Sequence, residues 1–130
     1  MPKFLNRILP KRLRDDGLTI PVVRLQGAIF ASGNQLRPAL SLAGTAGLIE
    51  KAFAFKDAPA VAIALNSPGG SPVQSRLIYK RIRDLADENN KPVLGFVEDA
   101  AASGGYFIAV AGDEIIADPS SIVGSIGVIY

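Results

Sequence analysis

The chain has 130 residues, 48% of them hydrophobic, so it is long enough for one globular domain with a hydrophobic core. Its net charge of +2 comes from the first 16 residues, and so local an excess of basic residues is not typical of nucleic-acid binding. The absence of histidine and cysteine excludes a Ser-His-Asp triad, a thiol nucleophile, disulfides and zinc-thiolate sites.

Residues 1–17 are expected to form a basic tail, followed by a domain over 18–130. The tail has no continuous apolar region of a secretory signal, and no run in the chain reaches the roughly 18 apolar residues that span a membrane. Its apolar side chains could rest on an anionic membrane surface, although Pro10 would cut a helix short and a solvated tail is the alternative. We therefore expect a protein of the cytoplasm or of the periphery of a bacterial inner membrane.

Strands and helices are expected to alternate along the rest of the chain. In order, the composition predicts a strand at 19–26, a loop at 31–38, a helix at 41–55, a strand at 60–65, a helix at 72–88, a strand at 93–97, a helix at 103–111, a strand at 114–117, a turn at 118–121 and a strand from 124 onward. This alternation favours an α/β fold with a mostly parallel sheet and right-handed crossovers.

Three of these elements carry more detailed expectations. The apolar runs at 60–65 and 93–97 are typical of strands buried on both faces. The helix at 72–88 is expected to bury one face, made of Val73, Leu77, Ile78, Ile82 and Leu85. Because the chain stops at Tyr130 inside an apolar, strand-like run, we expect it to be the front part of a longer protein.

The sequence Asn66-Ser67-Pro68-Gly69-Gly70-Ser71 follows a buried strand and precedes a helix, where ligands bind in open α/β sheets. Its glycines allow backbone amides to approach a ligand closely, and such an amide could donate to the oxyanion of a tetrahedral intermediate. The alternative is a tight turn in which Ser71 caps the following helix.

Ser103 lies in a second glycine-bearing sequence, Ala102-Ser103-Gly104-Gly105-Tyr106, at the start of an apolar helix. As a nucleophile it would attack a carbonyl group, with the Gly104 amide as an oxyanion donor. As a structural residue it would be the N-cap of the helix, a common role for serine. Two such sites, each after a buried strand, could face each other across neighbouring βα units.

These two sequences and Gly124-Ser125-Ile126-Gly127-Val128, in this order, resemble the signature blocks of the signal peptide peptidase A (SppA) family. Val22 to Ile29 is similar to the first strand of that family, so the resemblance covers about residues 20–130. It implies a ClpP/crotonase-like fold of stacked ββα units and a serine protease with a Ser-Lys dyad. Family members also resemble self-compartmentalising oligomers, which makes a homo-oligomer the expectation here.

By this resemblance, Ser103 matches the nucleophile, and Gly104 and Gly69 match the oxyanion donors, with Gly70 as a near alternative. Ser125 matches the hydroxyl that hydrogen-bonds the lysine base. The strands beside Gly70 and Gly127 would pair with an extended peptide, so Ser71, Ile126 and Gly127 are expected to contact substrate.

The lysine base itself is expected beyond Tyr130, because in the family it follows the Gly-Ser-Ile-Gly-Val block by several tens of residues. Every lysine of this sequence precedes Ser103: Lys3, Lys11, Lys51, Lys56, Lys80 and Lys91. The last four are expected to be solvated, whereas a lysine base must be desolvated. Glu98 and Asp99 are interpreted as capping or solvated acids.

The sequence thus predicts a serine endopeptidase for extended, apolar peptides such as signal peptide remnants, acting without a metal or organic cofactor. Two alternatives remain open. An acyl-CoA hydratase or isomerase of the same fold would share the oxyanion amides, although Ser103 and Ser125 argue against it. An inactive fragment or non-catalytic interaction subunit would assemble without turnover.

Overall fold

The computed structural model describes residues 17–32 and 39–127. The elements in these residues are β1 (Val22–Gln26), α2 (Leu42–Phe53), β2 (Val61–Ser67), α3 (Pro72–Asn89), β3 (Val93–Ala102), α4 (Gly104–Ala109), β4 (Glu114–Ala117) and β5 (Ile122–Gly124). The predicted α/β class is confirmed. Most of the tail predicted at 1–17 and most of the loop predicted at 31–38 lie outside the described residues.

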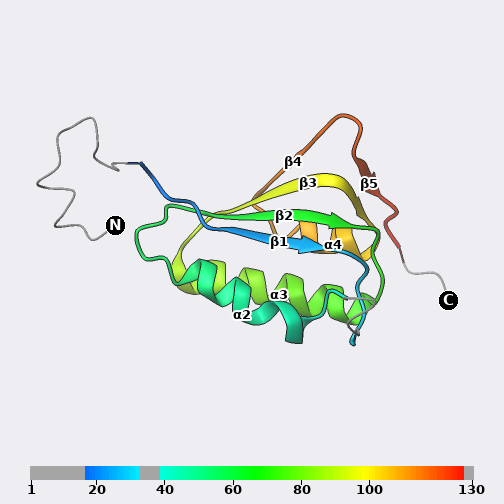
Figure 1. The fold of residues 1–130 in the computed structure, drawn as a ribbon, viewed down its shortest axis with the longest axis horizontal. Coiled ribbons are helices and arrows are strands. Elements are labelled where there is room, and N and C mark those ends of the chain that lie inside the picture. The colour runs from blue at the N-terminus through cyan, green and yellow to red at the C-terminus, as the bar shows by residue number, and fades with distance from the viewer. Residues whose placement is uncertain (1–16, 33–38, 128–130) are drawn as a thin grey trace, which may run out of the picture.

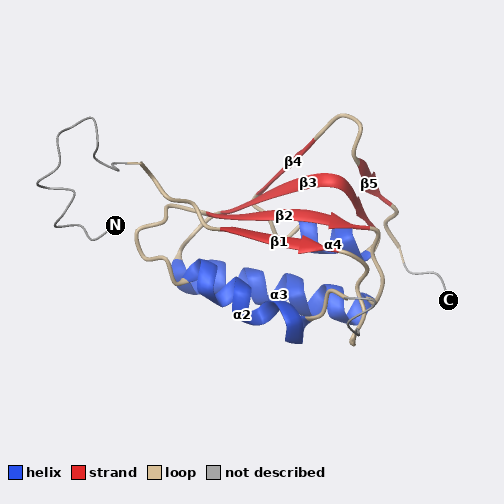
Figure 2. Cartoon of the chain, viewed as in Figure 1, coloured by secondary structure: helices blue, strands red, loops and turns tan. Residues whose placement is uncertain are grey.

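A parallel sheet forms the centre of the fold, with strand order β1-β2-β3-β4 and with β5 paired to the end of β3. Because every pair is parallel, the carboxyl ends of the strands lie at one edge (Figure 1). The helices α2, α3 and α4 lie on the same face of the sheet (Figure 2). The loops that leave β2 and β3 therefore start side by side, on the edge where α4 begins.

The core lies between the sheet and its helices. Leu25 and Ile63 of the sheet, Phe53 of α2 and Ile78 and Ile82 of α3 are each no more than 3% exposed. Burial of each such side chain stabilises the fold by roughly 1.5–3 kcal/mol relative to an exposed one. Ser41 begins α2 as an N-cap, because its hydroxyl accepts a hydrogen bond from the Gly44 amide.

The other face of the sheet is only partly buried in the described part of the chain. Val22 on β1 is 64% exposed, Phe96 on β3 is 40% exposed and Ile116 on β4 is 41% exposed. The expectation that 93–97 is buried on both faces is therefore wrong for Phe96, because no described helix covers that face. On β2 the residues on this face include Ala62, which is buried, and Ala64, which is half-buried, so the predicted burial of both faces nearly holds for this strand.

Two further expectations need correction. Val73, predicted on the buried face of α3, is 65% exposed, because it comes two residues before the buried Ser75 and so points to the opposite side of the helix. The last predicted strand begins earlier and ends at Gly124. Ser125 and Gly127, which follow this strand, both have positive φ, which is not the φ of an extended strand.

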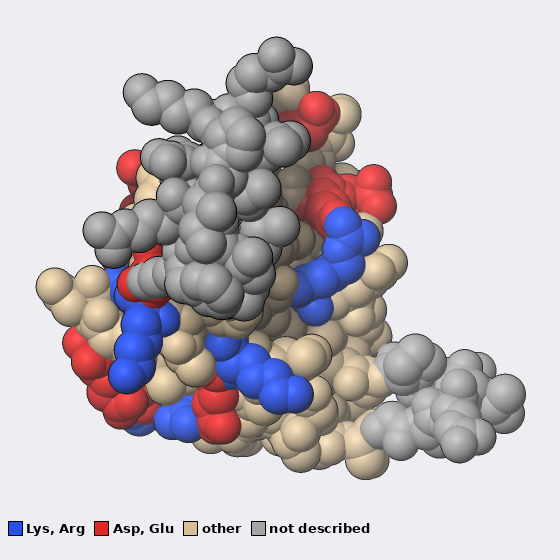
Figure 3. Space-filling model, turned by 60° about the vertical axis from the view of Figure 1, so that its left-hand side comes forward, with Lys and Arg blue, Asp and Glu red and all other residues tan. Residues whose placement is uncertain are grey.

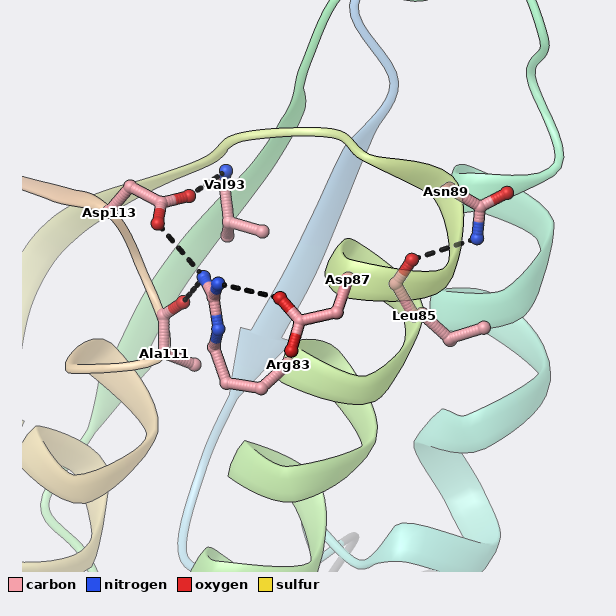
Figure 4. Close-up of polar contacts among 7 residues, drawn as sticks. All are labelled: Arg83, Leu85, Asp87, Asn89, Val93, Ala111 and Asp113. Carbon is pink, nitrogen blue, oxygen red and sulfur yellow. Dashed lines mark hydrogen bonds and ion pairs between the residues drawn. The ribbon is translucent and has the colours of Figure 1, made fainter.

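At the amino-terminal edge of the sheet, Arg83 of α3 links the helix to the turn before β4 (Figure 4). Its guanidinium donates to the carbonyl oxygen of Ala111 at 3.1 Å and pairs with Asp113 at 3.1 Å and Asp87 at 3.2 Å. Asp113 also accepts from the Val93 amide at 2.7 Å. This contact fixes the start of β3 against the end of α3.

The charged side chains of the described surface are of mixed sign: on the face drawn in Figure 3, basic and acidic groups lie next to one another. Within residues 17–32 and 39–127, the search for a helix long and apolar enough to span a bilayer gave none.

Candidate active site

Ser103 occupies the junction between β3 and α4, in a backbone conformation that is rare for a residue with a side chain. Its φ is 53° and its ψ is −118°. Its amide donates to the carbonyl oxygen of Gly124 at 2.8 Å, and its carbonyl oxygen accepts from Phe107 as α4 begins. Ser103 is the N-cap residue of α4 by position, as the alternative interpretation expects, but its side chain makes no capping hydrogen bond. Among the described residues its hydroxyl has no hydrogen-bond partner.

The glycine loop after β2 lies directly against this serine, as the predicted meeting of the two glycine-bearing sequences requires. A Cβ on Gly69 would lie 2.9 Å from Ser103 Cβ and 2.9 Å from the Gly104 nitrogen. A Cβ on Gly104 would lie 3.4 Å from the Gly70 nitrogen. Gly69 and Gly70 therefore pack directly against Ser103 and Gly104, and a side chain on Gly69 would have no room there.

The amides of the loop divide into those that are already bonded and those that are not. The Gly69 amide donates to Ser67 Oγ at 3.1 Å, and the Ser71 amide donates to the carbonyl oxygen of Ile29 at 2.7 Å. The amides of Gly70 and Gly104 have no acceptor among the described residues. Of the glycines named from the sequence, Gly70 and Gly104 thus have free donors, whereas Gly69 does not.

A cavity of about 370 Å³ opens beside Ser103. Its walls are predominantly apolar side chains and glycine backbone: Gly70, Pro72, Ser103, Gly104, Tyr106, Phe107, Val110, Ile126 and Gly127. Phe107 is held by Tyr79 of α3, whose ring meets it edge-on at 5.5 Å between centroids. The cavity can take an apolar group whose adjoining carbonyl would face the Ser103 hydroxyl.

The residues expected to contact substrate are divided by the structure. Ile126 and Gly127 line the cavity. Ser71 instead begins α3, where its hydroxyl accepts from the Gln74 amide at 3.3 Å, as in the capping alternative. Ser125 follows Gly124 with a φ of 56° and is exposed. The hydrogen bond from the Ser103 amide to the Gly124 carbonyl oxygen holds the segment that contains Ser125 next to Ser103.

Neither acid before Ser103 caps a helix, whereas Asp99 is exposed to solvent, as the sequence interpretation allowed, and Glu98 is half-buried. Both belong to β3: Glu98 pairs with Arg24 at 2.8 Å, and Asp99 accepts from the Asn66 side chain at 2.7 Å. The Asn66 side chain in turn accepts from the Ala100 amide at 3.2 Å. These contacts tie the ends of β2 and β3 together just before their functional loops.

The lysines in the described residues lie away from this cavity. Lys80 pairs with Asp84 on the exposed side of α3, and Lys91 donates to the carbonyl oxygens of Phe53 and Phe55. Lys51 lines a separate groove between α2 and β1, the first strand in the order of the sheet. Among residues 17–32 and 39–127, no group of His, Cys, Asp and Glu side chains is arranged to hold a metal ion.

The same fold occurs in the 1510-N membrane-bound stomatin-specific protease. The two structures superpose with a TM-score of 0.64 over 86% of this chain and 49% of the other, at 22% sequence identity. At that identity the likeness shows the fold alone.

Sequence comparison identifies the family. Residues 86–130 match the profile of peptidase family S49. The chain is 36% identical over 117 residues to the chloroplastic serine protease SPPA of Arabidopsis thaliana, covering 85% of this chain and 16% of that protein. The chain belongs to peptidase family S49, as its resemblance to the signal peptide peptidase A family implied.

A protein of Brucella melitensis named Na(+)/H(+) antiporter NhaA is more similar in sequence, at 70% identity over 129 residues. The match covers 99% of this chain and 18% of the Brucella protein. The chain thus spans less than a fifth of the length of either relative.

Proposed function

We propose that the chain supplies the nucleophile and the oxyanion donors of a serine endopeptidase. The observation that carries the proposal is the placement of the free Ser103 hydroxyl at the wall of an apolar cavity, beside the free amides of Gly70 and Gly104. Such donors stabilise negative charge that develops only in the transition state, and one of them typically accounts for about 10²–10³-fold in kcat.

In the proposed reaction, Ser103 Oγ attacks the scissile carbonyl while its proton passes to a general base. The carbonyl oxygen becomes an oxyanion and accepts hydrogen bonds from the Gly70 and Gly104 amides. Collapse of this intermediate breaks the C–N bond, and the base returns the proton to the leaving amine. Water then hydrolyses the acyl-enzyme on Ser103 with the same base.

The base is proposed to be a lysine outside the sequence in hand, as in the Ser-Lys dyad of the resembling family. The lysines described here are exposed or bonded elsewhere, and Lys80 and Lys91 already have oxygen partners. The Ser125 hydroxyl, in the segment tied to Ser103 through Gly124, is proposed to orient that lysine.

The proposed substrate is an extended peptide with an apolar side chain next to the cut bond, such as a signal peptide remnant. The cavity is lined by Tyr106, Phe107, Val110 and Ile126, which suit an apolar group. Gly70 and Gly127 flank the cavity, and the backbone beside them would pair with the peptide main chain.

The assembly of the protein is proposed by family resemblance: a homo-oligomer follows from the resemblance to self-compartmentalising peptidases. The proposed location is the cytoplasm or the periphery of the inner membrane, where the basic residues at 1–17 would contact an anionic membrane surface. The antiporter name belongs to a protein of which the match covers 18%, and transport is not part of this proposal.

The test is labelling of the full-length protein with a fluorophosphonate probe, together with hydrolysis of apolar fluorogenic peptides. Ser103→Ala should abolish labelling and lower turnover by at least about 10³-fold. The matched control is Ser120→Ala, which removes an exposed hydroxyl in the turn after β4 and should change neither result. An acyl-CoA hydratase would not be labelled, and an interaction subunit would assemble without turnover.

A further inference from the structure

We propose that Ser67 is a positioning residue that holds the glycine loop so that the Gly70 amide, rather than the Gly69 amide, faces the substrate. The inference rests on the proposed function, because it concerns the oxyanion donors of that site. Ser67 is the last residue of β2 and is 0% exposed. It lies behind the loop, out of the cavity, and would act on the reaction only through its neighbours.

The Ser67 hydroxyl uses both of its hydrogen-bonding functions inside the protein. It donates to the carbonyl oxygen of Gly27 at 2.7 Å and accepts from the Gly69 amide at 3.1 Å. The first bond anchors the hydroxyl to the segment after β1, and the second turns the peptide group between Pro68 and Gly69 toward the interior. The Gly69 donor is thereby removed from the candidate oxyanion site.

The next peptide group is fixed from the other side. The Gly69 carbonyl oxygen accepts from the Ile29 amide at 2.9 Å. In a trans peptide, the carbonyl of one residue and the amide N–H of the next point in opposite directions. Since the described peptides include no cis bond, the Gly70 amide points away from Ile29 and toward Gly104.

The loop needs such restraint because its glycines have little conformational preference of their own. Gly69 has a φ of +100° and Gly70 a φ of +145°, regions that glycine populates about as readily as their mirror images. The backbone preferences of these glycines therefore do not by themselves fix the peptide group between Pro68 and Gly69, and the bond from the Gly69 amide to Ser67 supplies that restraint.

Ser67 also contacts the helix that carries the second donor. A Cβ on Gly105 would lie 2.6 Å from the Ser67 carbonyl oxygen and 3.2 Å from Ser67 Cβ. One buried residue thus touches the loop of Gly70 and the first turn of α4, next to Gly104. Its hydroxyl bonds and its backbone contact together fix the relative positions of the two amides.

The experiment compares Ser67→Ala with the unsubstituted full-length protein. We expect kcat to fall by about 10²-fold and KM to change by less than threefold, since an oxyanion donor acts mainly in the transition state. Affinity for a peptide aldehyde, which forms a tetrahedral adduct with the serine, should fall with kcat/KM. Ser67→Cys, which keeps a weaker hydrogen-bonding group, should give an intermediate kcat.

The matched control is Thr45→Val. Thr45 is 5% exposed, its hydroxyl donates to the carbonyl oxygen of Ser41 at 2.8 Å in the first turn of α2, and it neither lines the cavity nor bonds the glycine loop. The Thr45→Val substitution removes one buried hydrogen bond, as Ser67→Ala does, and should leave kcat and aldehyde affinity unchanged. Equal losses of kcat in the two variants would overturn the proposal, because they would report a general loss of packing.

Amide hydrogen exchange provides a readout that does not depend on turnover. Exchange at Gly69 should accelerate by at least tenfold in Ser67→Ala and stay unchanged in Thr45→Val. The proposal for Ser67 would be contradicted if exchange at Gly69 were unchanged, or if kcat of Ser67→Ala were within threefold of that of the unsubstituted protein. Failure of the proposed function looks different: the unsubstituted protein itself would show neither turnover nor labelling of Ser103.

Discussion

Gly70 lies so close to Ile29 that a Cβ on the glycine would stand 2.1 Å from the Ile29 carbonyl oxygen. Its φ of +145° is also a conformation that other residues rarely adopt. Gly70→Ala should therefore displace the loop, destabilise the fold by at least about 2 kcal/mol and lower kcat by about 10²-fold. Urea unfolding and steady-state kinetics on the folded protein measure these effects. Wild-type kcat in a folded variant would contradict the prediction.

Gly47, on α2, gives the opposite expectation for the same substitution. A Cβ on Gly47 would meet nothing within 4 Å, and the residue lies inside a helix. Gly47→Ala should stabilise the fold by about 0.5–1 kcal/mol, because it removes the conformational freedom of glycine in the unfolded chain. The midpoint of urea unfolding should rise while turnover stays constant. A fall in the midpoint would show that the exposed side of α2 is packed against another element.

The arrangement of the two glycine-bearing loops could be predicted because it follows from local pattern and one general rule. Apolar strands followed by glycine and then by helix place both loops at the carboxyl edge of a parallel sheet. The contact between Gly69 and Ser103 confirms this. The exposure of Phe96 could not be predicted, since an apolar run does not reveal which of its faces a helix will cover.

Which of the two glycines, Gly69 or Gly70, has an amide without an acceptor among the described residues could not be predicted from the sequence. It depends on Ser67, whose hydroxyl partner Gly27 is 40 residues away along the chain. The only sequence signal was a polar residue at the end of an otherwise apolar strand. The contacts of Glu98 with Arg24 and of Asp99 with Asn66 also join residues far apart in the chain, so the sequence could not reveal them, although its interpretation of Asp99 as a solvated acid agrees with the exposure of that residue.

Val110 lines the cavity beside Ser103 and offers a way to change its size. If the proposed function holds, Val110→Phe should lower kcat/KM about tenfold for peptides with a large apolar residue before the cut bond. The loss is expected because a mismatch of even one methylene group in an apolar pocket costs about 10–200-fold. Peptides with alanine at that position still fit the smaller cavity and should be cleaved nearly as before. A series of fluorogenic peptides that differ only at this residue measures the effect.

The matched control for Val110→Phe is Val73→Phe. Val73 is 65% exposed on α3 and does not line the cavity, so the same enlargement there should leave the order of peptide preference unchanged. An equal loss of kcat/KM on all peptides in Val110→Phe would show that the substitution disturbs Ser103 rather than the cavity.

Arg83 should contribute more to stability than an ordinary surface ion pair, because one guanidinium bonds the Ala111 carbonyl, Asp113 and Asp87 (Figure 4). The side chain is only 28% exposed. Arg83→Met keeps most of the aliphatic stem but leaves the Ala111 carbonyl without its donor, and should cost about 1–2 kcal/mol. The change in the free energy of unfolding, from urea titration at constant m-value, measures it.

Lys80→Met is the comparison that isolates the cause. Lys80 lies on the same helix and makes one exposed i,i+4 pair with Asp84, which is typically worth about 0.2–0.5 kcal/mol. If the two variants lost equal stability, the Arg83 contacts would act as independent surface charges. A larger loss for Arg83→Met that persists in 1 M salt would instead identify the bond to the Ala111 carbonyl as the main contribution, because salt screens exposed ion pairs but not that hydrogen bond.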